Sequence, residues 1–483
     1  MRTVVKILAV TVILILSCCA NFGTGGLSYT PYSAEYTIAP YPLCNESANE
    51  ETKRLFEYLL SIYGKKTLAG ATMDGDEFEA FMNYCRTGRQ PAVRCYDFIF
   101  TAGDPNLDWV TNFAVDQAIE FHTKSGGIVE FCWHWFAPDK EGRRESFYAY
   151  HPLWLEEKWT KGTKLTPKSA LDPDGPYYRY ILRDIDAVAK QIKRLEAAGV
   201  PVLFRPLHEG GRGFLGPVFW WGNGGAAEYR ELWRFLYDKL TYEYNCTNII
   251  WVNNGERWGY YPGADYCDII SYDYYGKVGP EAGYDFGKLE FSRTLRLADS
   301  KKMIALSEND RIPNPNYMFD EKTYSPWLWF APWYGEYAYY ETYNSYAHLN
   351  EVYNSDYVIT LDELPNFDGF QRDIGTGYEY NFNKWGLTGE IQISLAQILK
   401  IDENDIKNNE IDCKNYYLYV YGDAVIIDEG YTYKNLTICC MENTSLTINN
   451  LKIQNSGREP AIKAMGALTI TEFGDCNYTR NMN

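Results

Sequence analysis

Residues 201–222 read PVLFRPLHEGGRGFLGPVFWWG, and this stretch decides how the fold is interpreted. It begins as an apolar run typical of a buried strand, turns polar at Arg205, and places His208 next to Glu209. A glycine-rich loop follows, with aromatic residues Phe214, Phe219, Trp220 and Trp221. A carboxylate at a strand end beside aromatic rings is typical of sites that bind and cleave sugars. Such a site needs a second carboxylate, which the rest of the chain has to supply.

Seven further apolar runs accompany this strand and alternate mostly with helical patterns. The predicted strands are 67–72, 91–100, 127–135, the run that begins at 201, 249–254, 268–275, 303–309 and 327–333. The predicted helices are 49–63, 76–84, 110–124, 178–198, 226–244, 286–300 and 346–353. Because near-continuous apolar strands are buried on both faces, we expect a parallel sheet closed into a (β/α)8 barrel. A doubly wound open sheet is the alternative, but no glycine-rich phosphate loop follows the first strand.

The chain divides into five predicted parts around this α/β fold. They are a signal peptide 1–20, an N-terminal lead 21–48, the (β/α)8 TIM barrel 49–366, a linker 367–412 and a small C-terminal β-rich extension 413–483. The extension contains short alternating strands, such as LTICC from residue 436 and ALTIT from residue 467, which suggests solenoid-like rungs. We expect a spacer or assembly role for it rather than a sugar-binding role.

The N-terminus has the pattern of a secretory signal peptide. Arg2 and Lys6 precede an uncharged apolar run, 7–16, which is too short to remain in a membrane, and a small-residue site ends at Ala20. Residues 15–18 also resemble a degenerate lipobox, which would leave a lipid anchor on Cys18. We favour simple secretion to the extracellular space, and no other segment is apolar for long enough to cross a bilayer.

The composition excludes some partners and favours others. The formal net charge of -18 argues against nucleic acid, because phosphate binding needs clustered Lys and Arg. Aromatic residues make up 17% of the chain, which suits a ligand with flat C–H faces as well as a tyrosine-rich core. The cysteines that follow the signal segment are even in number, which in an exported protein suggests disulfides. We expect a monomer.

The C-terminal ends of the predicted strands supply the second carboxylate at Glu308. Functional groups of such barrels gather at these ends, and retaining cleavage of a glycosidic bond needs two carboxyls about 5 to 5.5 Å apart. Glu209 ends the fourth strand and Glu308 the seventh, so both can reach one central mouth. Glu209 has to carry a raised pKa to act as the acid, which an aromatic wall favours by desolvation. Glu308 has to stay ionised, with the Tyr275 hydroxyl as its orienting partner.

These residues do not form a metal motif. A zinc-binding helix would need a second histidine four residues after His208, and Arg212 stands there. With five histidines in the whole chain, we expect no metal and no cofactor. Arg212 is interpreted as a solvated side chain rather than a sugar contact, and Asp273 as a hydrogen-bonding support rather than a third catalytic acid.

Three motifs in this order resemble glycoside hydrolase family 26, the β-mannanase family of a large clan of retaining (β/α)8 barrels. They are GGIVEFCWHW from residue 126, RPLHE from residue 205 with the later FWWG, and ALSEND from residue 305. The resemblance covers about residues 49–365, and the segment VITLDELP from residue 358 matches the usual end of the family's barrel. It implies that Glu209 is the acid/base and that Glu308 is the nucleophile.

The resemblance also implies supporting roles. His208 would position Glu209, and Tyr275 would be the partner of Glu308. His134 and Trp333, at the ends of two further strands, would form the floor of the −1 subsite. Where the family commonly has Trp five residues after the acid/base, this chain has Phe, which can stack on a sugar but lacks the indole N–H. The residues expected to contact substrate are His134, Trp135, His208, Phe214, Trp220, Tyr275 and Trp333.

The predicted function is that of a secreted retaining endo-β-1,4-mannanase. It would cleave internal links of mannan, glucomannan or galactomannan by double displacement. Within enzymes, the alternative is the same machinery acting on β-1,3-xylan or mixed-linkage β-glucan. From another class, the alternative is a catalytically silent polysaccharide-binding protein, against which the presence of both glutamates argues.

Overall fold

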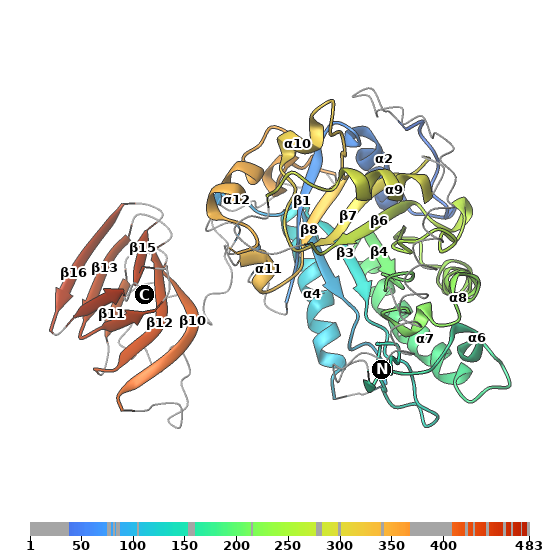
Figure 1. Cartoon of the computed structure of the whole chain (residues 1–483), viewed down its shortest axis with the longest axis horizontal. Helices are drawn as coiled ribbons and strands as arrows, with labels where there is room; N and C mark the ends of the chain where they lie inside the picture. Colours follow the sequence, from blue (N-terminus) through green and yellow to red (C-terminus); the bar gives the residue numbers. More distant parts are fainter. Residues whose placement is uncertain are drawn as a thin grey trace, which may run out of the picture.

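The computed structural model shows a barrel and a separate β-rich body within the chain (Figure 1). The predicted signal segment with Cys18, most of the predicted lead and linker, and Phe214 lie outside the residues that the structure describes. The described residues are 38–74, 79–80, 83, 87–103, 106–152, 160–213, 216–276, 283–297, 301–339, 342–367, 408–420, 424–427, 430–440, 444–456, 460–464, 467–474 and 476–480.

Eight parallel strands form a closed barrel, which confirms the predicted fold. They are β1 (Thr67–Thr72), β2 (Val93–Asp97), β3 (Ile128–Trp133), β4 (Val202–Pro206), β5 (Ile249–Asn253), β6 (Ile269–Tyr274), β7 (Met303–Asn309) and β8 (Trp329–Pro332). Each strand pairs in parallel with the next along the chain, and β8 pairs with β1 to close the ring. Residues of β1, β3, β4, β5 and β7 are buried along the whole strand, as near-continuous apolar runs predict.

A ninth short strand lies along the edge of β1 opposite to β8. β9 (Val358–Ile359) lies in the segment VITLDELP and pairs in parallel with the start of β1, where Thr67 faces Val358. β8 pairs with β1 one residue further on, where Leu68 faces Trp329. The first strand therefore contacts both of the last two, and the chain that leaves the barrel is tied to the strand that begins it.

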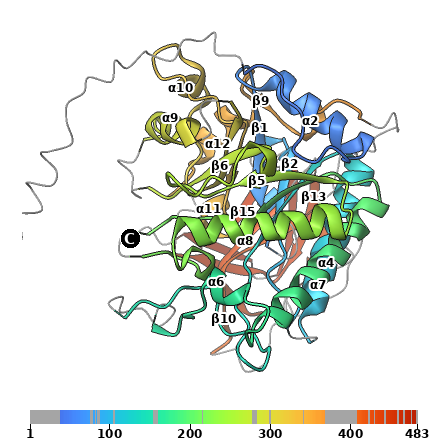
Figure 2. The ribbon, with the colours of Figure 1, turned by 90° about the vertical axis from the view of Figure 1, so that its right-hand side faces the viewer.

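The helices between the strands cover the outside of the ring (Figures 1 and 2). α2 (Glu50–Ile62) begins after Asn49, whose side chain accepts a hydrogen bond from the backbone N–H of Thr52 at 2.9 Å and caps the helix. α7 (Tyr178–Ala197) buries one apolar stripe and ends just before Gly199, whose φ is 75°. The other helices are α4 (Asp108–Ser125), α6 (Pro167–Ala170), α8 (Ala226–Asp238), α9 (Lys288–Leu297), α10 (Pro315–Phe319), α11 (Glu336–Tyr339) and α12 (Tyr346–Tyr353).

Some elements are shorter than the sequence predicts. The predicted strand 91–100 forms a ladder only over β2. The Phe98 backbone N–H still donates to the Cys132 carbonyl at 3.0 Å, and its ring stacks on Phe131 with 4.1 Å between ring centroids. The predicted helix 226–244 is α8 followed by a π-helical turn, Lys239–Glu243. Apolar periodicity continues through both of these irregular endings, so it could not mark them. The predicted helix 76–84 lies partly outside the described residues.

The described cysteines of the barrel carry free thiols. They are Cys44, Cys95, Cys132, Cys246 and Cys267, and the prediction of disulfides is wrong for these five. All but Cys44 are at most 2% exposed and pack as small apolar side chains. Cys132 lies in β3 as a buried thiol. Among the described residues, these cysteines contribute to the barrel through packing.

The C-terminal body is built from parallel strands with a core of its own. One sheet contains β10-β12-β14-β17, with β15 also paired to β12, and the other contains β11-β13-β16; every pairing is parallel. Ala424 pairs with Leu446 and Leu446 with Leu468, so strands stack at a regular interval as the rungs of a solenoid do. The strands are β10 (Glu410–Val420), β11 (Ala424–Ile427), β12 (Thr432–Cys440), β13 (Thr444–Asn449), β14 (Lys452–Asn455), β15 (Ile462–Ala464), β16 (Leu468–Phe473) and β17 (Asn477–Arg480).

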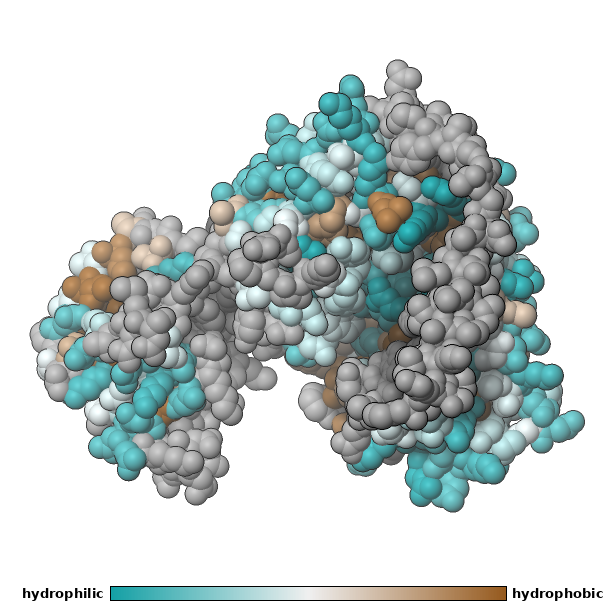
Figure 3. Space-filling view, in the orientation of Figure 1, coloured by the Kyte–Doolittle hydropathy of each residue, from teal (hydrophilic) through white to brown (hydrophobic). Residues whose placement is uncertain are grey.

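The described surface is largely hydrophilic on the face that Figure 3 shows. Large apolar side chains that are exposed include Phe113 at 44% and Trp258 at 77% exposure. Phe113 lies in α4, where the sequence shows it as part of an apolar pattern. Among the described residues, no helix combines the length and apolar character needed to cross a membrane.

Candidate active site

Two glutamates and one aspartate meet at the C-terminal mouth of the barrel. Glu209 follows β4, Asp273 lies in β6 and Glu308 lies in β7. One oxygen from each of the three carboxyls lies within 4.8 Å of one oxygen from each of the others. All three residues are buried, with exposures of 7%, 0% and 4%. The structure thus brings together the two glutamates singled out in the sequence and places Asp273 beside them.

The turn after β4 holds Glu209 in an uncommon backbone conformation. Leu207 and Glu209 both have φ of 51°, in the left-handed region that costs a non-glycine residue about 1 to 3 kcal/mol. Hydrogen bonds fix this turn: Asn254 Oδ1 accepts from the backbone N–H of Glu209 at 2.8 Å, and Trp221 Nε1 donates to the His208 carbonyl at 2.7 Å. The strained backbone positions thus include Glu209, whose side chain lies at the mouth of the barrel.

Arg205 is the fully buried cation beneath the carboxylates. Its Nε donates to Glu130 at 2.7 Å, its Nη1 to Asp273 at 3.1 Å and its Nη2 to Glu308 at 2.7 Å. The guanidinium is 0% exposed, and so are two of its three partners. One cation among three carboxylates leaves an excess of negative charge, which favours retention of protons in this region. Accordingly, burial raises the pKa of Glu130 although Arg205 lowers it.

Glu308 is oriented by two donors. Its Oε1 accepts from Arg205, and its Oε2 accepts from the Tyr275 hydroxyl at 2.9 Å, the contact expected from the sequence. Burial, followed by the charge of Asp273, raises the pKa of Glu308 to about 8, while Arg205 acts in the opposite direction. Each oxygen of Glu308 therefore has its own donor, and Arg205 is itself held by Glu130 and Asp273.

Glu209 has a different set of partners. Burial raises its pKa to about 8, and the Arg212 guanidinium opposes this shift. Arg212 Nη1 donates to Glu209 Oε1, and Arg212 Nε forms an ion pair with Glu256 at 3.0 Å. Arg212, interpreted from the sequence as a solvated side chain, is only 23% exposed. It lies directly against the carboxyl expected to act as the acid.

A pair of histidines lines the mouth on the side of β3. The Nε2 atoms of His134 and His208 are 3.2 Å apart, and His134 Nδ1 lies 2.5 Å from Asp97 Oδ2. Burial lowers the pKa of His134, but the Asp97 carboxylate outweighs it and the net pKa lies above the ordinary value. Burial, and then the charge of His134, lowers the pKa of His208 well below its ordinary value. His134 is thus favoured as the cation and donor, with His208 as the neutral acceptor.

Aromatic rings form the wall beside these histidines. The ring of Phe219 lies 4.9 Å from that of His208 and 5.5 Å from that of His134, between centroids. Tyr148 stacks on Phe219 at 5.7 Å. Trp333, which follows β8 and is half-buried, lies 5.8 Å from His134 between ring centroids. A sugar placed over the carboxylates would meet apolar ring faces here.

Trp135 and Trp220 lie beneath the site rather than in its wall. Their exposures are 1% and 0%, which differs from the expectation that both contact substrate. Trp135 stacks on Trp133 with 4.1 Å between centroids, and its Nε1 donates to Asp184 Oδ2 at 3.0 Å. Trp220 Nε1 donates to the Trp135 carbonyl at 2.7 Å. Each indole N–H is therefore already used inside the protein, and the two rings support the loop that carries His134.

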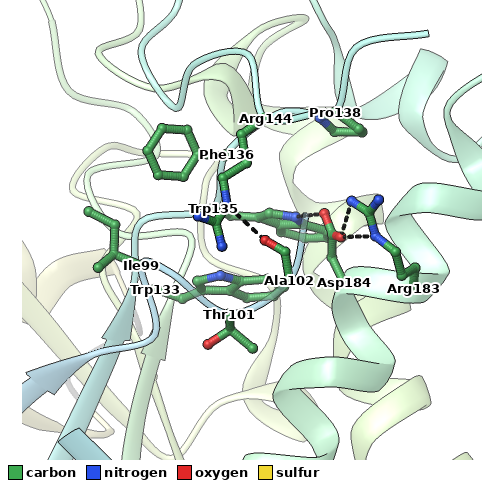
Figure 4. Close-up of a pocket in the computed structure, with 10 residues that line it drawn as sticks. All are labelled: Ile99, Thr101, Ala102, Trp133, Trp135, Phe136, Pro138, Arg144, Arg183 and Asp184. Atoms are coloured by element: carbon green, nitrogen blue, oxygen red, sulfur yellow. Dashed lines mark hydrogen bonds and ion pairs between the residues drawn. The ribbon is translucent and has the colours of Figure 1, made fainter. Parts of the chain in front are cut away.

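A small pocket opens beside Trp135, away from the carboxylates (Figure 4). In it, Asp184 Oδ1 pairs with Arg183 Nη2 at 2.6 Å while the other oxygen accepts from Trp135. Neither Glu209 nor Glu308 lines this pocket, so it lies outside the candidate active site. The lining residues are Ile99, Thr101, Ala102, Trp133, Trp135, Phe136, Pro138, Arg144, Arg183 and Asp184.

Two clusters of side chains have the donor types of a metal site. In the cluster of Glu209, Asp273 and Glu308, carboxylate oxygens already accept hydrogen bonds from the guanidinium groups of two arginines, with which a metal cation would compete. In the cluster of Asp97, Cys132 and His134, burial raises the pKa of the Cys132 thiol well above its ordinary value, which keeps the sulfur protonated and makes it a poor ligand. Both clusters suit proton transfer better than metal binding. They consist of Glu209, Asp273 and Glu308, and of Asp97, Cys132 and His134.

Several charged residues of the site were not identified from the sequence. Asp97 ends β2, but the predicted strand extended to residue 100, so Asp97 was not recognised as a strand end. Glu130 and Arg205 lie inside strands, where an isolated charge gives no indication of its partner. Glu256 follows β5 by three residues and belongs to no motif. Only Asp97 had a signal that could have been used, its place at the end of a strand.

A (β/α)8 barrel with two buried glutamates at the ends of its fourth and seventh strands, close together and beside aromatic rings, defines the glycoside-hydrolase class of barrels. The family model described as Glycosyl hydrolase family 26 matches residues 44–363. The chain belongs to this family, which confirms the resemblance seen in its motifs.

Relatives of known name agree with this assignment. The chain is 37% identical over 326 residues to a mannan endo-1,4-beta-mannosidase of Thermothelomyces thermophilus, covering 67% of this chain and 63% of the relative. A solved GH26-CBM35 beta-(1,4)-mannanase of Podospora anserina has a TM-score of 0.57 and 36% identity, covering 68% of this chain and 71% of that one. A beta-mannanase from a symbiotic protist of the termite Reticulitermes speratus, solved with a gluco-manno-oligosaccharide, has a TM-score of 0.59 and 29% identity, covering 68% and 99%. The chain spans less than two thirds of the length of the Thermothelomyces relative.

Proposed function

We propose that this protein hydrolyses internal β-1,4 links of mannan-type polysaccharides with retention of configuration. The observation that carries the proposal is the pair Glu209 and Glu308, whose nearest oxygens lie within 4.8 Å of each other. Retaining glycosidases hold their carboxyls about 5 to 5.5 Å apart, whereas inverting ones need about 6.5 to 9.5 Å to admit a water. The substrate class is supported by the relatives, which are named as mannanases.

The two carboxyls differ in their partners, and this difference supports their separate roles. Together they retain a proton at neutral pH, since burial raises both pKa values to about 8. Arg205 and Tyr275 both donate to Glu308, which stabilises its ionised form as the nucleophile. Glu209 then keeps the proton and gives it to the leaving oxygen while Glu308 attacks the anomeric carbon.

The second half of the reaction reverses the proton transfer. The covalent bond between Glu308 and the sugar is attacked by water, and Glu209, now ionised, takes a proton from that water. The bond to Glu308 breaks, and both carboxyls return to their starting states. His134 and Trp333 would form the floor under the sugar, with Phe219 as the wall.

The test of substrate and reaction uses the purified full chain. Release of reducing sugar is measured on mannan, glucomannan, β-1,3-xylan and lichenan, and we expect hydrolysis of the first two. Glu308→Ala should abolish turnover while binding of mannohexaose remains measurable by calorimetry. Preference for xylan or lichenan would replace the substrate class, and unaltered hydrolysis by Glu308→Ala would refute the nucleophile.

A rescue experiment tests the acid/base. Glu209→Ala should retain slow cleavage of aryl mannosides with good leaving groups, because these need no proton. Azide should increase its rate by attacking the glycosyl-enzyme in place of base-assisted water. Absence of both effects would argue against Glu209 in this role.

We also propose that the protein is exported and acts as a monomer. The support for export is the pair Arg2 and Lys6 before the apolar run 7–16. Mass analysis of the mature protein decides between cleavage after Ala20 and a lipid on Cys18. Light scattering at working concentration gives the mass of the particle and tests the monomer.

A further inference from the structure

The loop after β4 carries an arginine that no step of the proposed reaction uses. Arg212 lies three residues after Glu209, and its backbone N–H donates to the Glu209 carbonyl at 2.9 Å, which folds the loop into a tight turn. The guanidinium points back into the mouth, where Nη1 reaches Glu209 and Nη2 donates to the backbone carbonyl of Asp273. An arginine in this position stabilises the ionised form of the residue that has to be protonated to begin the reaction.

A second carboxylate lies within reach of the same guanidinium. Glu256 Oε2 pairs with Arg212 Nε at 3.0 Å, and Glu256 Oε1 accepts from the backbone N–H of Asp273 at 3.1 Å. The side chain of Glu256 is 5% exposed, and its backbone has φ of 57°, in the strained left-handed region. Arg212 therefore lies between two buried carboxylates, one expected to transfer a proton and one without such a role.

The loop that carries Glu256 is attached to the loop that carries Arg212. Gly211 N donates to the Gly255 carbonyl at 3.0 Å, and Arg257 Nη2 donates to the Gly213 carbonyl at 2.6 Å. These contacts hold the two loops together independently of the ion pairs. The Arg212 guanidinium therefore pairs with both carboxylates at once, through Nη1 with Glu209 and through Nε with Glu256.

We propose that Arg212, anchored by its ion pair with Glu256, is a positioning residue that stabilises the ionised form of Glu209 and stays paired with Glu256 when Glu209 carries its proton. The proposal rests on the acid/base role of Glu209 in the proposed function. It matters because an acid/base alternates between both states in each turnover, so an ion pair with Glu209 alone would favour one half-reaction over the other. Glu256 supplies the second partner that keeps the guanidinium paired in both states.

Other charged groups that face Glu209 have partners of their own. Asp273 and Glu308 are tied to Arg205, and the Tyr275 hydroxyl is tied to Glu308. Burial raises the pKa of Glu256 to about 7, while the Arg212 guanidinium acts in the opposite direction and favours its ionised form. The groups that face Glu209 are Arg212 from its own loop, Glu256 from the loop after β5, Asp273 and Tyr275 from β6 and its end, and Glu308 from β7.

The experiment compares two substitutions that should act in opposite directions. Arg212→Met removes the cation, so the alkaline limb of the kcat/KM profile on mannan should move up by about one pH unit or more. Glu256→Gln leaves the guanidinium with a single carboxylate, so the limb should move down by about the same amount. Aryl mannosides with good leaving groups should show little loss of kcat/KM with Glu256→Gln. A purely structural role would lower the rate at every pH without moving the limb.

A second readout does not depend on catalysis. In the full chain labelled with carboxyl-13C glutamate, the Glu209 signal is assigned by its absence in Glu209→Gln and titrated without substrate. Its midpoint should rise in Arg212→Met and fall in Glu256→Gln, and equal midpoints or shifts in the same direction would overturn the proposal. If the wild type cleaves no mannan, the proposed function fails, while this titration still tests the effect of Arg212 and Glu256 on the protonation of Glu209.

Two further variants guard against trivial outcomes. Arg257→Met removes a neighbouring guanidinium that ties the same two loops at Gly213, and it should leave the Glu209 midpoint unchanged. Arg212→Gln keeps an N–H donor toward Glu256 but no charge, and it should give the same upward shift as Arg212→Met. It replaces that variant if the methionine form does not fold, which is checked by tryptophan fluorescence.

Discussion

Replacing Glu308 by Gln should stabilise the barrel at alkaline pH, although it removes the proposed nucleophile. The carboxyl is 4% exposed, and burial followed by the charge of Asp273 raises its pKa to about 8 from the ordinary 4.5. The folded pair of Glu209 and Glu308 therefore keeps a proton that the unfolded chain releases. This stabilisation is complete below pH 4.5 and is lost as pH rises through 8. Glutamine resembles the protonated form at every pH, so the variant does not lose it.

The size of the effect follows from the two pKa values. A pKa raised from 4.5 to about 8 corresponds to roughly 5 kcal/mol of unfolding free energy lost between these values. Glu209 lies within 4.8 Å, and its pKa is raised in the same way, so the two carboxyls share the effect. We expect Glu308→Gln to be more stable than the wild type by about 2 to 3 kcal/mol at pH 9 and by less than about 1 kcal/mol at pH 5.

Urea unfolding at the two pH values, followed by tryptophan fluorescence, measures this difference. Residues 408–480 contain no tryptophan, so the signal reports the barrel rather than the C-terminal body. The control is Glu120→Gln in α4, whose side chain is 61% exposed and which should change stability by less than about 0.5 kcal/mol at either pH. An equal gain at both pH values, or a loss at pH 9, would refute the reasoning.

Three further outcomes are expected. Tyr275→Phe removes the O–H that donates to Glu308 at 2.9 Å, and a hydrogen bond to a charged group is worth about 1.5 to 3 kcal/mol. In steady-state kinetics, kcat on mannan should therefore fall by roughly 10- to 100-fold with a smaller change in KM. An unchanged kcat would contradict this role of Tyr275. Asp97→Asn removes the carboxylate that raises the pKa of His134, so the imidazole midpoint followed by NMR should move to lower pH, and a midpoint that stays in place would contradict the pairing. Trp220→Ala empties a site with 0% exposure and should lower the unfolding free energy by about 3 to 5 kcal/mol, whereas a loss below 1 kcal/mol in urea titration would show that the ring is not part of the core.

Strand positions could be predicted because the barrel strands are buried on both faces. Each appears in the sequence as a short apolar run closed by polar residues, and this pattern gave all eight strands of the barrel. The ends of such strands meet at one mouth, so Glu209 and Glu308 could be paired across about one hundred residues without knowledge of the fold. Local pattern and global topology agree at these positions.

The burial of individual side chains could not be predicted in this way. Trp220 and Phe219 are neighbours in the same aromatic motif, yet one is fully enclosed and the other stands against the histidines. The difference depends on the loop from residue 136 onward, whose packing the sequence does not indicate. Charge networks are equally hidden, because Arg205 finds its partners on three other strands and no spacing rule connects them.

The seam at β1 has a consequence for how the chain is made. The strand at residues 67–72 is synthesised early, but its partners β8 and β9 end at residue 359. At about 5 to 20 residues per second, a ribosome needs roughly 15 to 60 s to pass from the first strand to the last. Throughout that interval one edge of β1 has no strand to pair with, and an unpaired edge is where nascent chains associate wrongly. During synthesis, the edge of β1 that later pairs with β8 is thus the part of the barrel that waits longest for its partner.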